Sequence, residues 1–303
     1  MTDVGQFIVI GLVTGTLYAL IALGYTMVYG IIELINFAHG DLFMLGSFAA
    51  LQVLVWSGVT SSGNNSSIAA IALMLVAAPL FCAGLNVAVD RAVYRPVRNA
   101  PKLAAIVSAI GVSFIFMNLG LVWQGATDVN FPSLIPATNL LHRDDIRLTY
   151  KDLLVIGVTV PTMVALTLFV RYTALGKAMR ATAQNPTAAQ LMGINIDRVI
   201  AATFAIGGAL AGVASVVYGL YFNTVGYQMG FQNGVYAFTA AVLGGIGNIP
   251  GAVLGGVTIG LVRSLGSAYV GEKWSEALIF VILIVILIFR PNGLLGARTR
   301  EKV

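Results

Sequence analysis

Residues 15–48 read GTLYALIALGYTMVYGIIELINFAHGDLFMLGSF, two apolar runs joined by a short segment that carries Glu33, Asn36, His39 and Asp41. A helix needs about 20 apolar residues to cross a hydrocarbon core of about 30 Å. Lipid disfavours ionisable and amide side chains, so the backbone must break here beside water or inside protein. The stretch therefore predicts two membrane helices with a polar interruption between them.

The whole chain of 303 residues has the same apolar character. Hydrophobic residues make up 58% of it, charged residues make up 10%, and the mean hydropathy is +0.90. Soluble domains carry about 25% charged residues, so a water-soluble domain is excluded. The apolar runs are of helix length and lack the alternation of a transmembrane β-barrel. We predict an all-α, polytopic integral membrane protein with one transmembrane domain over residues 1–303.

Eight or nine spans are expected, because one candidate is short enough to be a re-entrant half-helix. The predicted spans are 5–29, 38–57, 68–90, 103–122, 151–170, 199–221, 233–247 (the short one), 250–268 and 277–290. The N-terminal sequence MTDVGQ lacks the basic region of a cleaved signal peptide, so we expect the first span to be retained.

Lys and Arg residues are concentrated in three regions, and the positive-inside rule places such regions in the cytoplasm. The alternation predicts an outer N-terminus and a cytoplasmic C-terminus, and it assigns the positive charge to loops rather than to a nucleic-acid surface. The three groups are Arg91, Arg95, Arg98 and Lys102, then Arg171, Lys177, Arg180 and Arg198, then Arg290, Arg298, Arg300 and Lys302. Asp128, Asp144 and Asp145 offset bases in the predicted outer loop 123–150.

A second interrupted stretch, AVLGGIGNIPGAVLGG at 241–256, also joins two apolar runs without a long loop. Paired broken segments in a membrane protein indicate a translocation path. The predicted helix breaks are Gly40, Gly244, Gly245, Gly247, Pro250 and Gly251.

Two interpretations of the polar residues are open. They form a wet cytoplasmic turn in which Asp41 caps the next helix, or they line the path or its gate. The path candidates are Asn36, His39, Asp41 and Asn248. His39 and Asp41 alone have too few ligands for a metal site.

Glycines at helical spacing predict close helix packing within the chain. Arg263 lies inside an apolar run and must reach an interface, a cavity or an acidic partner. The glycine pairs are Gly11 with Gly15, Gly208 with Gly212, Gly251 with Gly255, and Gly256 with Gly260.

The predicted cytoplasmic loop 171–198 contains a short helix. Asn185 followed by Pro186 is a helix-start signal, and Gly193 is a helix stop. The helix exposes Leu191 and Met192, an apolar end that usually needs a protein surface to cover it. Asp197 is expected to cap the following span.

The sequence TAAQLMG at 187–193 resembles the EAA-x-x-x-G signature of bacterial ATP-binding cassette (ABC) importer permeases. Ala188, Ala189 and Gly193 match it, whereas Thr187 replaces the acidic residue. Other stretches resemble the shorter permeases of high-affinity branched-chain amino acid importers. They are GTLYALIALGYTMVYGII-x-x-INFAHGD (15–41), AVYRPVR (92–98), GINIDRVIAATFAIG (193–207), AFTAAVLGGIGNIPGAVLGG (237–256) and RPNGLLG (290–296).

The resemblance implies an ABC importer permease fold in a bacterial inner membrane. The implied partners are a second permease, two cytoplasmic ATPases that hold ATP and Mg, and a periplasmic binding protein. The implied ATPase-docking residues are Thr187, Ala188, Ala189, Leu191, Met192 and Gly193. The chain has no G-x-x-x-x-G-K-[ST] sequence, so we expect it to be no enzyme and to bind no cofactor.

The solute stays open at this point. Urea, a short amide or another neutral amino acid would suit a similar permease. An ATP-independent carrier would explain the broken segments but would leave the helix at 187–193 without a purpose.

Overall fold

The computed structural model describes residues 4–58, 64–98, 100–136, 138–140, 146–290 and 292–296. Asp144, Asp145, Arg298, Arg300 and Lys302, on which the predicted orientation partly depends, lie outside these residues. The first half of the chain forms α1 (Val4–Ile32), α2 (Ala38–Ser57), α3 (Asn64–Val89), the π-helix η1 (Asp90–Tyr94), α4 (Arg95–Val97), α5 (Lys102–Gln124) and β1 (Val129–Asn130). The second half forms α6 (Tyr150–Tyr172), α7 (Ala174–Gln184), α8 (Pro186–Leu191), α9 (Ile196–Phe222), β2 (Thr224–Val225), α10 (Met229–Gly244), α11 (Ile249–Tyr269) and α12 (Glu272–Phe289).

Seven of the described helices are long and apolar enough to cross a membrane. They confirm an all-α polytopic membrane protein. The predicted segment 233–247 corresponds to α10, which has 16 residues and is shorter than the about 20 residues of a full span. The predicted segment 277–290 corresponds to α12, which has 18 residues and begins with charged side chains.

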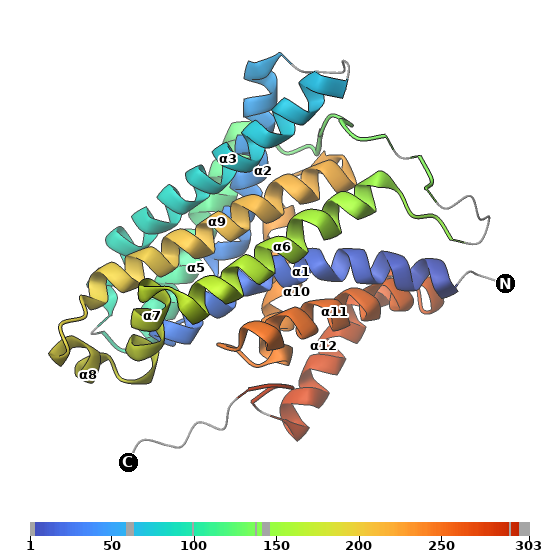
Figure 1. Ribbon diagram of the computed structural model, residues 1–303. Helices are drawn as coiled ribbons and strands as arrows, with labels where there is room; N and C mark the ends of the chain where they lie inside the picture. The colour runs from blue at the N-terminus through green and yellow to red at the C-terminus, as the bar shows by residue number, and fades with distance from the viewer. Residues whose placement is uncertain are drawn as a thin grey trace.

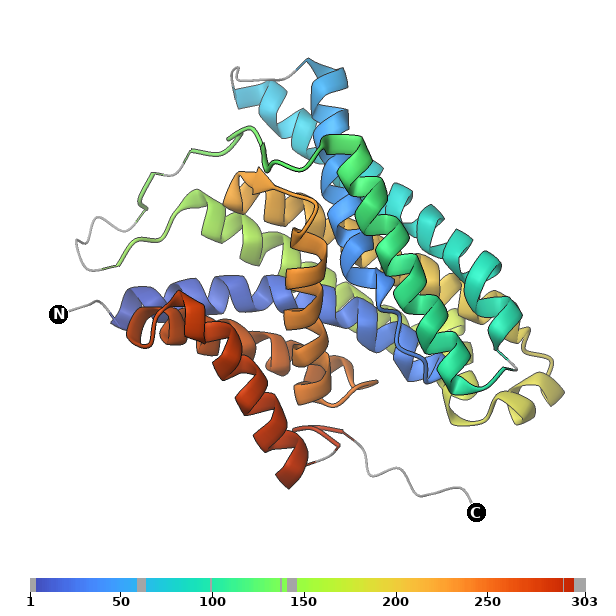
Figure 2. The same cartoon turned by 180° about the vertical axis from the view of Figure 1, so that it is seen from behind.

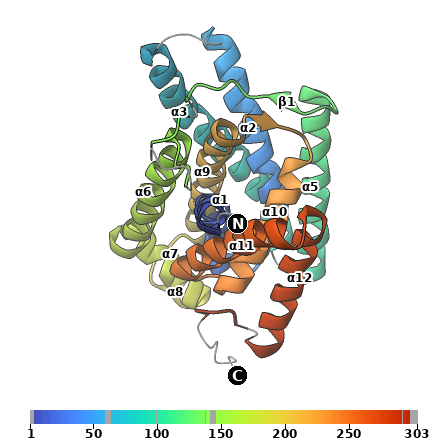
Figure 3. The same ribbon diagram turned by 90° about the vertical axis from the view of Figure 1, so that its right-hand side faces the viewer.

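Helix α1 lies at the centre of the bundle, where it contacts α6, α9, α10 and α11 (Figure 3). Its side chains are buried on all sides over most of the stretch 11–28, as expected for a helix that is apolar all round. Glycines bring α1 against α11, since a Cβ atom at Gly15 would lie 2.8 Å from the Cα of Val257. A Cβ atom at Gly212 of α9 would lie 2.5 Å from the Cα of Pro79. Packing within the chain therefore uses these predicted glycines.

The helix connections gather at two ends of the bundle. Helices α7 and α8 lie at one end, and the segment that joins α5 to α6 lies at the other (Figure 1). In that segment β1 pairs antiparallel with β2, with Val129 opposite Val225. Helix α10 lies between two groups of helices, with α2 and α5 on one side and α12 on the other (Figure 2).

Candidate functional site

Helix α8 begins as the sequence predicts. Asn185 is its N-cap, and the side-chain oxygen accepts a hydrogen bond of 3.0 Å from the backbone N–H of Ala188. Pro186 occupies the first turn, where its missing N–H needs no partner. The local sequence therefore sets where the helix starts.

The end of α8 is also as predicted. Gly193 has a φ of +82°, a left-handed conformation that favours glycine. Its N–H donates to the carbonyl of Gln190, and the N–H of Ile194 donates to the carbonyl of Ala189, each at 3.0 Å. These two bonds form a Schellman motif, which satisfies carbonyls that a helix end otherwise leaves free.

The apolar end of α8 is exposed. Leu191 is 84% exposed and Met192 is 83% exposed, whereas Ala189 faces inward and is buried. Thr187 and Ala188 are exposed as well. The predicted exposure of Leu191 and Met192 is therefore confirmed. Their role in docking stays a prediction.

Helix α7 precedes α8 and was not predicted. Thr173 ends α6 and caps α7, accepting a hydrogen bond of 3.0 Å from the N–H of Gly176. Helix α7 contacts α1, α6 and α9, with Met179 buried. Thr173 was the available signal, because threonine is a favoured N-cap and helix-forming residues follow it. The loop 171–198 therefore contains two helices, of which α7 is held against the bundle.

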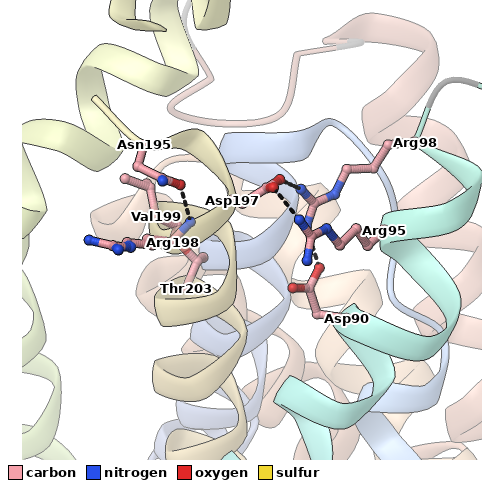
Figure 4. Close-up of polar contacts among 8 residues, drawn as sticks. All are labelled: Asp90, Arg95, Arg98, Asn195, Asp197, Arg198, Val199 and Thr203. Carbon is pink, nitrogen blue, oxygen red and sulfur yellow. Dashed lines mark hydrogen bonds and ion pairs between the residues drawn. The ribbon is translucent and has the colours of Figure 1, made fainter. Parts of the chain in front are cut away.

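Asp197 does not cap α9, so that prediction is wrong. The N-cap is Asn195, whose side-chain oxygen accepts from the N–H of Arg198 at 3.0 Å (Figure 4). The carboxylate of Asp197 instead pairs with Arg95 and Arg98, with a nitrogen to oxygen distance of 2.7 Å in each pair. Asp197 thus joins the first turn of α9 to the segment after α3.

Arg98 is the centre of this ion cluster. It also pairs with Asp90 at 2.6 Å, so a single guanidinium bridges Asp90 of η1 and Asp197 of α9 (Figure 4). Asp90 is buried and Arg98 largely so, whereas Arg95 is exposed. Because α9 follows α8 directly, the cluster ties the segment after α8 to the end of α3. Asp197 lies about 100 residues after the other three members, so no local pattern could have predicted its part in the cluster.

Replacing Arg98 with glutamine is expected to destabilise the protein more than replacing Arg95 with glutamine. The Arg98 variant leaves the buried carboxylate of Asp90 unpaired, at a cost of about 1–3 kcal/mol or more. The Arg95 variant removes an exposed pair worth about 0–1 kcal/mol. Melting temperatures of the two purified variants test this, and equal shifts would show that Arg98 has no special bridging role.

The first broken segment places three of its four polar residues inside the protein, whereas Glu33 is exposed. Helix α1 ends at Ile32, Glu33 has a φ of +52°, and α2 begins at Ala38. The ring of His39 lies 4.7 Å from that of Tyr25. Tyr25 is about 10 Å before the end of α1, at about 1.5 Å per residue. The chain therefore runs back along α1 before α2 starts.

Two predictions for this segment are wrong. Gly40 is not a helix break, because it lies in the first turn of α2. It packs against α10 instead, where a Cβ atom would lie 2.8 Å from the Cα of Gly234. Asp41 does not cap α2, because Phe37 is the N-cap and makes no side-chain capping bond.

Asn36, His39 and Asp41 are buried, so they do not form a wet turn. Asn36 donates to the side-chain oxygen of Asn86 and accepts from the hydroxyl of Tyr94, each at 3.2 Å. Asn86 in turn donates to the carbonyl of Phe204 at 2.6 Å. Asn36 therefore belongs to a buried network that joins the first break to α3, η1 and α9.

The second broken segment has its breaks at Gly245 and Gly247, whose φ values are +102° and +92°. Gly244 is the last residue of α10, while Pro250 and Gly251 lie in the first turn of α11 rather than in the break. Asn248 caps α11, accepting from the N–H of Gly251 at 3.1 Å.

Residues 292–296, here named the C-terminal strap, cover this break. The N–H groups of Leu294 and Leu295 donate to the carbonyls of Leu243 and Gly244 at 2.8 Å and 3.0 Å. The side chain of Asn248 donates to the carbonyl of Leu295 at 2.6 Å. The strap thus supplies donors to the end of α10, where helix carbonyls lack partners.

A cleft of about 890 Å³ brings the two breaks together. Glu33 and Asn248 line it, with Arg171 and Arg180 from α6 and α7. The strap contributes Asn292 and Gly296. Of the predicted path residues only Asn248 is in this cleft. Asp41 lines a separate pocket between α2, α5 and α10.

Arg263 of α11 reaches aromatic residues rather than lipid. Its guanidinium donates to the hydroxyl of Tyr18 and lies 4.7 Å from the ring centroid of Tyr236. The hydroxyl of Tyr236 donates to Glu276 of α12 at 2.6 Å. A cation over an aromatic face is stabilised electrostatically, which accounts for an arginine inside this apolar helix.

Comparisons with known proteins agree with these features. Residues 7–287 match the family described as the permease component of branched-chain amino acid transport systems. The chain is 41% identical over 296 residues to the high-affinity branched-chain amino acid transport system permease protein LivH of Salmonella typhimurium, covering 97% of this chain and 96% of the relative. It is 40% identical over 310 residues to the corresponding protein BraD of Pseudomonas aeruginosa, covering 98% and 97%.

A solved structure gives the same fold at lower identity. PsaBC from Streptococcus pneumoniae, in complex with Fab, superposes with a TM-score of 0.50 and 15% identity, covering 94% of this chain and 92% of that one. This likeness concerns the fold alone. The family match and the identities over nearly the full length show that the chain belongs to the family of branched-chain amino acid transport system permease components.

Proposed function

We propose that this chain is one permease subunit of an ABC importer that moves branched-chain amino acids across the bacterial inner membrane. Its proposed partners are a second, paralogous permease, two cytoplasmic ATPases and a periplasmic binding protein that delivers the solute. ATP and Mg are held by the ATPases, and this chain supplies no catalytic group. The N-terminus is periplasmic and the C-terminus cytoplasmic in this proposal.

The observation that carries the docking role is the exposed apolar end of α8. Leu191 and Met192 are neighbouring apolar side chains that are almost fully exposed. Adjacent exposed apolar residues often mark a surface that binds another protein. The two hydrogen bonds of the Schellman motif fix the direction of α8 relative to α9. An ATPase surface that covers α8 would push or pull on α9 and, through Arg98, on η1. A loaded binding protein outside and ATP inside then bias the permease between two arrangements.

The translocation path is proposed to run beside the two broken segments. The cleft that contains Glu33 and Asn248 lies against the start of the docking loop. His39 and Asp41 do not line this cleft. They are buried in the first turn of α2, inside the bundle. Asn36 holds the first break to α3 and η1 and would act by positioning that segment.

Labelled leucine uptake into proteoliposomes tests the solute. The vesicles contain the wild-type chain with its co-encoded permease, ATPases and binding protein. ATP-dependent leucine uptake supports the proposal. Failure to take up leucine, isoleucine or valine would overturn the solute class and direct the test to urea, short amides and other neutral solutes. Uptake without any ATPase would favour a secondary carrier.

Docking is tested by replacing Leu191 with glutamate. A charge in the centre of an apolar contact should reduce ATPase co-purification by about tenfold or more, the equivalent of ~1.4 kcal/mol. The matched control replaces Thr187 with glutamate, one turn earlier on α8. A carboxylate in the first turn of a helix interacts favourably with its dipole, so this variant should retain at least the wild-type amount of ATPase. If the wild type and both variants co-purify with equal amounts of ATPase, Leu191 is not part of the docking surface.

A further inference from the structure

A small pocket with a buried carboxylate lies between α2, α5 and α10. Its volume is about 130 Å³, and its polar groups come from Asp41, Ser113 and Tyr25. The remaining lining is apolar and includes Phe37, Phe231 and Phe238. Liquid water occupies about 30 Å³ per molecule, so the space suits a small organic solute.

Asp41 has no cationic side chain beside it in this pocket. Its side chain is buried, the hydroxyl of Ser113 donates to Oδ2, and Oδ1 has no hydrogen-bond partner among the described residues. None of the ion pairs in the described part of the chain includes Asp41. A carboxylate removed from water is costly unless it is paired and hydrogen-bonded. A cationic ligand would supply the missing partner.

The glycines of α10 leave room for this carboxylate. Gly230 packs directly on Asp41, and a Cβ atom there would lie 2.9 Å from Oδ1. Gly234, one turn later, also lines the pocket. Any larger residue at Gly230 would therefore crowd the oxygen that has no partner.

The N-terminus of α10 provides a group of opposite charge at the same place. Gly230 and Phe231 in its first turn line the pocket, and no side chain caps the helix at Gln228. Free N–H groups and the helix dipole make such an end favourable for anions. In membrane transporters the N-termini of short helices are used in this way for substrate carboxylates. The pocket thus pairs an uncapped helix N-terminus with an anionic side chain.

Aromatic rings complete the surroundings of the carboxylate. The ring of Phe238 lies 6.1 Å from that of Tyr25 and 6.0 Å from that of Phe37. Aromatic faces attract an ammonium group and also accommodate aliphatic carbon. The walls therefore tolerate both parts of an aliphatic amino acid.

We propose that this pocket is a binding site inside the membrane for the zwitterionic head group of a neutral α-amino acid. Asp41 accepts hydrogen bonds from the ammonium group, and the first turn of α10 binds the carboxylate. The aliphatic side chain lies against the apolar wall that includes Ile110 and Met117. This inference rests on the proposed function, because it names the group of this chain that recognises the transported solute.

The test uses the complete importer in proteoliposomes with Asp41→Asn, which keeps the size of the side chain and removes its charge. Leucine uptake should fall by about tenfold or more, the usual loss when a charge-assisted hydrogen bond is removed. ATP hydrolysis stimulated by the loaded binding protein should continue, and the complex should assemble in normal amounts. A purely structural role for Asp41 would lower assembly and ATP hydrolysis together with uptake.

The matched control is Ser47→Ala. Ser47 is a buried polar residue of the same helix that donates to the carbonyl of Ser215 at 3.2 Å and lies outside the pocket. It should retain leucine uptake. If the Asp41→Asn variant takes up as much leucine as the Ser47→Ala variant, the proposal is wrong.

A second pair of variants keeps the test valid if Asp41→Asn fails to assemble. Ile110→Trp fills the pocket from α5 without changing the carboxylate, whereas Ile115→Trp adds the same bulk outside that pocket. Uptake should be lost only with Ile110→Trp, and equal uptake by the two variants would contradict a solute site here. If the wild-type importer takes up no branched-chain amino acid, the proposed function itself fails, whatever these variants do.

Discussion

Replacing Gly193 with proline is expected to abolish ATP-driven uptake while the membrane helices stay folded. Gly193 has a φ of +82°, whereas proline is fixed near −65°. Proline also removes the N–H that donates to Gln190. The chain must then leave α8 in a different direction, at a local cost of about 1–3 kcal/mol. Because α8 lies outside the bundle, the cost falls on docking and coupling rather than on the membrane fold.

The measurement is leucine uptake by the reconstituted importer, with the melting temperature of the permease as a readout of the fold. The matched control is Gly193→Asn, because asparagine adopts the left-handed conformation more readily than other residues with a side chain. A Cβ atom at Gly193 has no atom within 4 Å, so the control has room. Normal uptake by the proline variant would remove the rigid connection between α8 and α9 from the mechanism.

The sequence predicted α8 well because its signals are local. Asn185, Pro186 and Gly193 act on backbone groups within a few residues, and these interactions do not depend on the rest of the fold. The apolar runs predicted the long helices for a similar reason, since lipid requires each span to satisfy its own backbone.

The ion cluster and the environment of Asp41 depend on distant parts of the chain. Asp197 was expected to cap α9, but Asn195 precedes it in the cap position and leaves Asp197 free for Arg95 and Arg98. Gly40 was expected to be a helix break, whereas its role is to let α2 approach α10. A pattern of neighbouring residues in the sequence does not predict which distant helix will pack against a given residue.

The C-terminal strap is a further feature that sequence reasoning missed. The motif RPNGLLG at 290–296 contributed to the family resemblance without an assigned structural role. The structure shows Leu294 and Leu295 bonded to the last carbonyls of α10. A turn signal such as Asn292-Gly293 predicts a change of direction, but not the helix end to which the chain returns.

Replacing Gly245 with valine is expected to displace this strap and to inactivate the protein. Gly245 has a φ of +102°, which valine adopts only with strain. A Cβ atom there would also lie 2.7 Å from the Cα of Gly296 and 2.9 Å from the carbonyl oxygen of Asn292. If the strap moves away, the carbonyls of Leu243 and Gly244 lose their donors, at about 1–3 kcal/mol for each buried group.

The matched control is Gly271→Val, because it separates backbone strain from loss of the strap. Gly271 has nearly the same φ, +100°, but no atom lies within 4 Å of its Cβ position. Both variants should lower the melting temperature through strain, and Gly245→Val should lower it further. Leucine uptake should be lost with Gly245→Val alone, because the strap and the second break line the same cleft. Equal melting temperatures and equal uptake in the two variants would show that the strap contributes neither stability nor shape to the path.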